Sequence, residues 1–254
     1  MLGLSGDPLQ QTGSCVRSLA FLTPSAVAEE DVRGKTAIIV DVFRATTTIL
    51  TALERGARMV IPVADMNEAG QLASNLDPSA FLLAGERLGK KIEGYHLGNS
   101  PSEMLPEVIA GKTIILTTTN GTRAVAAARG ADHIVSATFR NLNASVEYVK
   151  ALGKDVVVVA SGWRGRLSLE DTLCAGYLLS ELHGTDFHAD EADDAFIAHS
   201  LYQRYKAQLT ETLRAGSHAH RLHLMQADAD VDYALHMNVS DGVPRLKDGA
   251  FVLK

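Results

Sequence analysis

The chain has 254 residues, of which 46% are hydrophobic and 21% charged, and its formal net charge at pH 7 is −6. These values are typical of a globular protein that can bury a sizeable core. The negative charge argues against a protein that binds nucleic acid or an acidic membrane surface.

The first sixteen residues are poor in charge and lack the basic and continuous apolar regions of a signal peptide. We expect residues 1–16 to be a flexible N-terminal extension. No linker rich in Pro, Gly or Ser divides the remainder, so 17–254 is predicted to be a single unit. The longest apolar runs, such as 156–160, are too short to span a bilayer, and no membrane association is expected.

The two cysteines, Cys15 and Cys174, have neither metal-ligand spacing nor the number needed for a disulfide framework. We therefore expect free thiols and a reducing, cytoplasmic location. Cys174 lies in an apolar helical run and is predicted to be a small core residue.

Strand-like and helix-like patterns alternate along the first 183 residues. Strands are predicted at 17–21, 36–41, 58–63, 80–84, 112–118, 132–136 and 155–160, and helices at 45–55, 66–75, 102–109, 121–129, 143–151 and 169–183. Several of the strands are continuous apolar runs, which is typical of strands covered by helices on both faces. This predicts an α/β fold with a largely parallel or mixed sheet flanked by helices, and with the loops that follow the strands along one sheet edge.

The pattern changes after about residue 184. Residues 190–236 are predicted to form a helical C-terminal portion, and 243–246 with 250–253 a short hairpin that turns at Asp248-Gly249. Apolar faces of the C-terminal helices would suit a homodimer and would equally suit the core of a monomer.

The first loop with chemical content is Asp41-Val42-Phe43-Arg44-Ala45-Thr46-Thr47-Thr48, directly behind the apolar strand 36–40. The helix that follows reaches a glycine stop at Gly56. Aspartate and threonine at such a turn often only cap the helix. An arginine beside three threonines goes beyond capping, and the loop suggests a phosphate ester together with a hard cation such as Mg²⁺.

The second loop runs from Gly85 to Glu103 and is long for a connection between packed elements. Its candidate residues are Glu86, Arg87 and Asn99. The segment 100–103 also reads as an ordinary helix start with a proline in its first turn.

The third loop, Thr117-Thr118-Thr119-Asn120-Gly121-Thr122-Arg123, precedes an alanine-rich helix. Small hydroxyl residues and a glycine allow backbone N–H groups to approach a phosphate closely. The loop lacks the Gly-Lys-Ser/Thr ending of a P-loop.

The fourth loop, 161–171, combines Arg164 and Arg166 with the adjacent carboxylates Glu170 and Asp171 at a helix start. Two arginines can hold a dianion. The carboxylates can bind a metal, or they can simply be favourable charges at a helix N-terminus.

The nine histidines include a cluster of His218, His220 and His223. No acidic third ligand stands at a recognised spacing, so a solvated helix face is favoured over a metal site. No Gly-x-Ser-x-Gly nucleophile motif is present, although Asp41 could act as a nucleophile.

At these four loops the sequence resembles the 2-phosphosulfolactate phosphatase (ComB) family. The matching motifs are DVFRATTT (41–48), GERLG with GNSPSE (85–89 and 98–103), TTTNGT (117–122) and GRLSLEDTLCAG (165–176), in family order, with weaker similarity as far as Val243-Pro244. The resemblance implies a Mg²⁺-dependent acid phosphatase that converts 2-phospho-3-sulfolactate to 3-sulfolactate and phosphate, a step of coenzyme M biosynthesis in methanogens.

The residues assigned to these roles fall into three groups. Expected catalytic residues are Asp41, Arg44, Glu170 and Asp171. Expected Mg²⁺ ligands come from Asp41, Glu86, Glu170 and Asp171. A small, multiply anionic substrate is expected to contact Thr46, Thr47, Arg87, Asn99, Thr118, Thr119, Asn120, Gly121, Thr122, Arg123, Arg164 and Arg166. The hypothesis is attack by a water whose pKa the metal lowers and which one of the carboxylates orients.

Two alternatives stay open. The protein could hydrolyse another small phospho-carboxylic acid, such as phospholactate or phosphoglycerate. It could also be a non-catalytic protein that binds an organic anion or phosphate, which would need the arginines and threonines but not the four carboxylates.

Overall fold

The computed structural model describes residues 17–183 and 193–253. The predictions for residues 1–16, Cys15, 190–192 and residue 254 therefore lie outside the described residues. Within them no helix is long and apolar enough to cross a bilayer.

Strands and helices alternate through the first part of the chain, as predicted. The strands are β1 (Ser18–Phe21), β2 (Thr36–Val40), β3 (Met59–Val63), β4 (Phe81–Arg87), β5 (Lys90–Lys91), β6 (Thr113–Thr117), β7 (His133–Ala137) and β8 (Val156–Ala160). The helices are α1 (Glu29–Val32), α2 (Ala45–Glu54), α3 (Met66–Ala73), α4 (Pro106–Ile109), α5 (Gly121–Ala127), α6 (Leu142–Leu152) and α7 (Leu169–His183). Every residue of β2, β6 and β8 is buried, as their continuous apolar runs indicate.

The predicted helix over 102–109 is wrong in its extent. A short 3₁₀ turn covers Pro101–Glu103, and α4 begins only at Pro106. Leu105 is extended, with φ −75° and ψ 132°, because the proline ring disfavours helical backbone in the residue before it. By contrast, α2 ends where predicted, with Gly56 at φ +94°.

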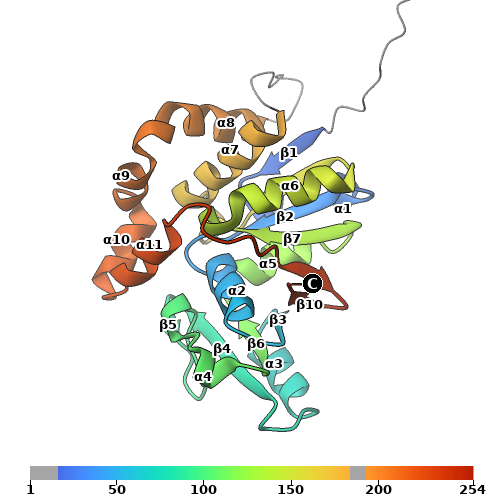
Figure 1. Cartoon of the computed structure of the whole chain (residues 1–254), viewed down its shortest axis with the longest axis vertical. Helices are drawn as coiled ribbons and strands as arrows, with labels where there is room; N and C mark the ends of the chain where they lie inside the picture. The colour runs from blue at the N-terminus through green and yellow to red at the C-terminus, as the bar shows by residue number, and fades with distance from the viewer. Residues whose placement is uncertain (1–16, 184–192, 254) are drawn as a thin grey trace, which may run out of the picture.

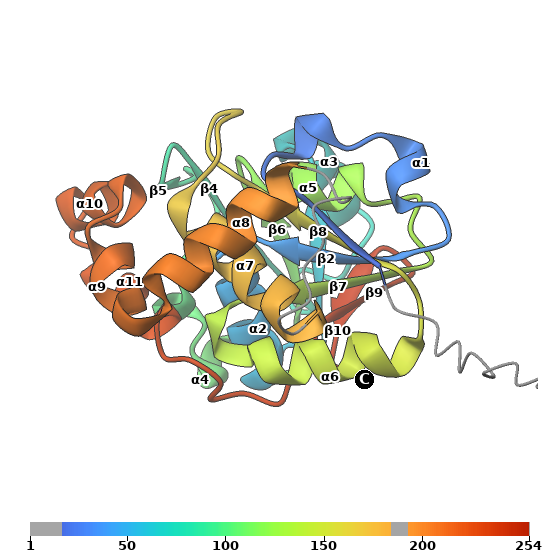
Figure 2. The ribbon, with the colours of Figure 1, turned by 90° about the horizontal axis from the view of Figure 1, so that it is seen from above.

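The helical C-terminal portion is confirmed for 193–236. It contains α8 (Asp193–Tyr205), α9 (Leu209–Arg214), α10 (Ser217–Leu224) and α11 (Asp228–Ala234). The predicted hairpin follows as β9 (Arg245–Lys247) and β10 (Ala250–Val252). Figures 1 and 2 show α9, α10 and α11 gathered at one end of the molecule.

The described residues form a mixed ten-stranded sheet in the order β1-β8-β2-β7-β9-β10-β3-β6-β4-β5. One parallel group contains β1, β8, β2 and β7, and a second contains β3, β6 and β4. The C-terminal hairpin lies between them and pairs antiparallel with each. Phe251, fully buried, anchors this hairpin in the core.

The hairpin changes how the loops come together. Three antiparallel pairings separate β7 from β3, so the two parallel groups run in opposite senses along the sheet. The prediction of one common sheet edge is therefore wrong. Loops that follow strands of both groups nevertheless line one cavity, which residues of α10 also line.

Candidate functional site

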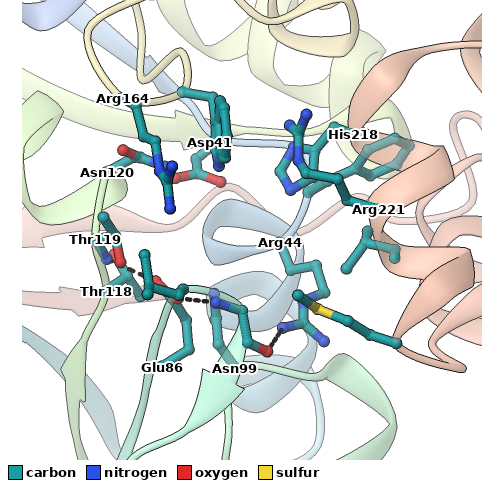
Figure 3. Close-up of a pocket in the computed structure, with 16 residues that line it drawn as sticks. Asp41, Arg44, Glu86, Asn99, Thr118, Thr119, Asn120, Arg164, His218 and Arg221 are labelled. Atoms are coloured by element: carbon teal, nitrogen blue, oxygen red, sulfur yellow. Dashed lines mark hydrogen bonds between the residues drawn. The ribbon is translucent and has the colours of Figure 1, made fainter.

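A cavity of about 310 Å³ lies where the loops after β2, β4, β6 and β8 meet helix α10. Figure 3 shows that Thr118, Thr119 and Asn120 border one side of it and His218 and Arg221 the opposite side. The cavity therefore joins two parts of the chain separated by about a hundred positions in the sequence.

Asp41 follows the last residue of β2 and is 6% exposed. Its Oδ1 accepts a hydrogen bond from the Ala45 N–H at 3.2 Å, which holds the carboxylate at the start of α2. A Cβ on Gly121 would lie 2.9 Å from Asp41 Oδ2, so glycine is the residue that leaves room for this oxygen. Burial raises the pKa of Asp41 to about 6.

Glu86 sits near the end of β4, and backbone groups of two loops fix both its oxygens. Oε1 accepts from the Thr119 N–H and Oε2 from the Gly89 N–H, each at 2.7 Å. The Gly89 carbonyl in turn accepts from Arg44 Nη2 at 3.1 Å. This chain of hydrogen bonds ties three of the four loops together (Figure 3).

Arg44 is buried and paired. Its Nη1 lies 2.7 Å from Oδ2 of Asp230, and the two side chains are 10% and 3% exposed. Asp230 belongs to α11 and also accepts hydrogen bonds from Ser100 Oγ at 2.6 Å and Ser102 Oγ at 3.3 Å. Sequence reasoning missed Asp230, which carries no local signal because its partner Arg44 lies 186 positions away.

Glu170 and Asp171 are buried at the start of α7 and do not line the cavity. Asp171 Oδ1 accepts from the Val42 N–H at 2.8 Å, and its Oδ2 from the Gly162 N–H at 3.1 Å. Burial raises the pKa of Asp171 well above its usual value, and the nearby Glu170 and Asp41 raise it further. Asp171 thus links the backbones of the loops that follow β2 and β8.

His218 lines the cavity, so the prediction of a solvated helix face is wrong for this residue. Its Nδ1 lies 2.6 Å from Oε1 of Glu170, and its ring meets Phe43 edge to face at 5.8 Å between centroids. His223 is exposed beside Asp228. Helical spacing alone could not show which histidine lines the cavity and which is exposed, because the packing of α10 decides it.

The threonines divide into two groups. Thr46 and Thr47 are buried, and their hydroxyls donate to the carbonyls of Asp41 and Val42, at 2.9 and 2.8 Å, rather than facing the cavity. Thr118, Thr119 and Asn120 line the cavity. Gly121 and Thr122 stand behind them, and the Thr122 hydroxyl donates to the Thr118 carbonyl at 3.0 Å.

The arginines divide in the same way. Arg87, Arg123 and Arg166 are exposed and lie outside the cavity wall. Arg164 lines the cavity as predicted, and α10 adds Arg221, which sequence reasoning missed. The guanidinium carbons of Arg164 and Arg221 lie 4.6 and 3.8 Å from the centroid of the Trp163 ring.

The donors that could hold a divalent cation are fewer than predicted. Of the four carboxylates expected, only Asp41 and Glu86 line the cavity. In the parts of the chain that the structure describes, no group of three or more His, Cys, Asp or Glu side chains is arranged around a metal position. Asn99 lines the same cavity, however, and its buried Oδ1 has no hydrogen-bond partner within 17–183 and 193–253.

This donor set fits Mg²⁺. In proteins Mg²⁺ is commonly held by one or two carboxylates, with substrate phosphate oxygens and water completing its octahedron. Asp41, Glu86 and the amide oxygen of Asn99 supply oxygen ligands of this kind beside polar groups suited to an anion.

Comparison with known proteins gives consistent matches over almost the whole chain. The family model described as 2-phosphosulpholactate phosphatase matches residues 21–249. A protein of Caldanaerobacter subterraneus subsp. tengcongensis named "Probable 2-phosphosulfolactate phosphatase" is 40% identical over 230 residues, which are 90% of this chain and 95% of that protein. Proteins with the same name from Thermotoga maritima and Symbiobacterium thermophilum are 40% and 37% identical, over 88% of this chain and 94% and 96% of their own lengths.

Proposed function

The chain belongs to the 2-phosphosulfolactate phosphatase family, and from that premise we propose that it is a phosphoric monoester hydrolase that converts 2-phospho-3-sulfolactate to 3-sulfolactate and phosphate with Mg²⁺. The observation that carries the proposal is the composition of the cavity. Two carboxylates, three arginines and a row of small polar side chains line about 310 Å³, a size suited to a three-carbon substrate with three acidic groups.

The phosphate is expected to lie against the loop after β6. Thr118, Thr119 and Asn120 present polar groups there, and Arg44 reaches the same cavity from the start of α2. Positive charge and hydrogen-bond donors aimed at the equatorial oxygens stabilise the charge that these oxygens carry in the transition state. Because Asp230 and the Gly89 carbonyl fix Arg44, little reorganisation is needed when substrate binds.

Asp41, Glu86 and Asn99 are the residues that would hold Mg²⁺. When bound, the ion polarises the phosphoryl group and lowers the pKa of a water molecule. Asp41 is the residue best placed to orient the attacking water and accept its proton. Among the described residues no group donates to its Oδ2, whereas Glu86 is fixed by two N–H groups. His218, held by Glu170, places a second ionisable group across the cavity.

The test is phosphate release from 2-phospho-3-sulfolactate by the purified protein, first with Mg²⁺ and then with excess EDTA. We expect turnover that EDTA abolishes and added Mg²⁺ restores. Turnover of phospholactate or phosphoglycerate without turnover of phosphosulfolactate would overturn the substrate assignment, while the protein would still be a phosphatase. Failure to hydrolyse any phosphate ester would overturn the enzyme assignment in favour of an anion-binding protein.

A further inference from the structure

The loop after β8 and helix α10 meet on one side chain, Trp163, at the edge of the cavity. Trp163 is the single tryptophan of the sequence. Arg164 and Arg221 both place their guanidinium groups over its ring, at 4.6 and 3.8 Å from the centroid. All three side chains line the cavity, and we refer to Trp163, Arg164 and Arg221 as the arginine–tryptophan cluster.

The loop is built to present this cluster. Trp163 and Arg166 exchange backbone hydrogen bonds of 2.7 and 3.0 Å, which close a two-residue turn over Arg164-Gly165. Both turn residues are left-handed, with φ values of +50° and +74°. This conformation suits glycine but is uncommon for arginine, so the arginine is placed there at some cost in backbone energy.

The charges of this cluster are not compensated as that of Arg44 is. Within the described residues, neither Arg164 nor Arg221 forms an ion pair with a carboxylate, and the hydrogen bond that Arg221 donates goes to the Ser217 hydroxyl at 3.3 Å. Partial burial lowers the pKa of Arg221 and the neighbouring Arg164 lowers it further, while Glu170 opposes both effects. Two guanidinium groups that contact one ring at the cavity wall, and that have no carboxylate partner among the described residues, can together bind an anion.

The substrate offers an anion of the right kind. In the proposed function the phosphate is taken by the loop after β6 and by the Mg²⁺ donors, across the cavity from α10 (Figure 3). The carboxylate and the sulfonate of the substrate must then contact positively charged side chains elsewhere in the cavity. A sulfonate is a strong acid that stays ionised at all working pH values, and it presents three acceptor oxygens that planar guanidinium groups bind well.

We propose that the arginine–tryptophan cluster binds the sulfonate of the substrate and thereby selects phosphate esters that carry a second strong acid on the adjacent carbon. The inference rests on the proposed function, because it assigns a subsite of the same cavity. Trp163 holds the two guanidinium planes by cation–π contact. Arg221, which belongs to the helical C-terminal portion, contacts the sulfonate and so discriminates between substrates.

The first test compares two substrates that differ only in the sulfonate. Wild type and Arg221→Met are assayed with 2-phospho-3-sulfolactate and with 2-phospholactate. We expect the substitution to lower kcat/KM for phosphosulfolactate about tenfold to a hundredfold, mainly through KM, and to change that for phospholactate less than threefold. An equal loss on both substrates would overturn the proposal, because it would mean a general effect on the cavity.

Three further variants serve as checks. Arg164→Met should show the same selective loss and provides an independent test if Arg221→Met does not fold. Arg129→Met removes an exposed arginine that does not line the cavity and should leave both substrates unaffected. Arg221→Lys keeps the charge but loses the planar donors, so it should recover only part of the selectivity.

The second test needs neither Mg²⁺ nor turnover. Because Trp163 is the single tryptophan, intrinsic fluorescence reports occupation of the cluster directly. Titration with 3-sulfolactate should give a saturable fluorescence change that is at least tenfold weaker in apparent affinity for Arg221→Met, whereas lactate should bind wild type and variant alike. A response to 3-sulfolactate that Arg221→Met leaves unchanged would overturn the subsite.

The two tests separate this inference from the proposed function. Wild type that hydrolyses no phosphate ester, yet binds 3-sulfolactate through Arg221, would overturn the enzyme and support the subsite. Wild type that hydrolyses phosphosulfolactate and phospholactate equally well, with no fluorescence response to 3-sulfolactate, would support a phosphatase and overturn the subsite.

Discussion

The two walls of the cavity are stabilised in different ways. In the wall formed by the loops after β2, β4 and β6, backbone N–H groups bind Asp41 and Glu86, and threonine hydroxyls bind carbonyls of their own loop. The opposite wall comes from α10, where His218 and Arg221 are held by side chains of α7 and of the loop after β8. The first wall is fixed mainly by backbone groups within and between its loops, and the second by contacts between side chains.

This difference separates two functional tasks. The strand-end wall carries fixed carboxylates and small polar groups suited to a phosphate and a metal, which require close and constant geometry. The helical wall carries long cationic side chains with few protein partners, which suit recognition of a substrate's distal group. We therefore expect substitutions in the first wall to affect turnover and those in the second to affect substrate choice.

The largest effect is expected from Asp41→Asn in the strand-end wall. Asparagine keeps the shape but cannot take a proton or bind a cation as strongly, so kcat should fall on the order of a thousandfold with little change in fold. Phosphate release and far-UV circular dichroism measure the two quantities. Asp132→Asn, at a partly exposed ion pair with Lys154, is the matched control and should keep full activity. Retained activity in Asp41→Asn would rule out its assigned role.

The next effect concerns the buried ion pair between Arg44, in the strand-end wall, and Asp230 of α11. Asp230→Asn leaves a buried guanidinium without its counter-charge, and we expect a loss of about 3 kcal/mol in the free energy of unfolding. Urea denaturation measures it. Asp232→Asn, two positions away, removes an ion pair with Arg214 in which both side chains are about half exposed, and should cost less than about 1 kcal/mol. Similar losses in the two variants would show that burial does not make the Arg44–Asp230 pair more important for stability than an exposed pair.

A smaller effect is expected where the helix α5 approaches Asp41. A Cβ added at Gly121 would lie 2.8 Å from Ala45 Cβ and 2.9 Å from Asp41 Oδ2. Gly121→Ala should therefore lower stability by about 1 to 3 kcal/mol and reduce activity by displacing the carboxylate. Gly70→Ala in α3 meets no atom within 4 Å and should be neutral or stabilising by about 0.5 to 1 kcal/mol. Equal outcomes would contradict the close approach.

The last comparison is a pH dependence of stability in the metal-free protein. Folding raises the pKa of Asp41 from 3.8 to about 6, so its contribution to stability is complete below pH 4 and is lost as the pH rises through 6. Asp41→Asn cannot ionise. In EDTA it should therefore exceed wild type by about 3 kcal/mol at pH 8 and by almost nothing near pH 4. A difference independent of pH would mean that burial does not raise this pKa.

The local sequence was sufficient for most of the fold. Continuous apolar runs identified the buried strands β2, β6 and β8, because a strand covered on both faces has no polar side to alternate with. The hairpin at Asp248-Gly249 was equally readable from its turn residues, which take φ values of +50° and +81°. Where an element was misjudged, at α4, a proline moved its start.

The site could be predicted only in part. The loops that end β2, β4 and β6 were identified because their polar residues are adjacent in the chain, and Asp41, Glu86, Asn99 and Thr118 all line the cavity. The same motifs could not separate Arg164, which lines it, from Arg87, Arg123 and Arg166, which do not. Neighbouring residues of one loop point to different sides, and only the surrounding packing decides which side is the cavity.

What the sequence by itself determined is therefore the set of elements and the chemical character of the strand ends, since both depend on interactions between residues close in the chain. Tertiary structure alone decided that loops of both parallel groups line one cavity, that Asp230 neutralises Arg44, and that α10 adds His218 and Arg221 to the site. These contacts join residues far apart in the chain, and no local pattern encodes their partner, because the burial and charge balance that select it exist only after the chain has folded.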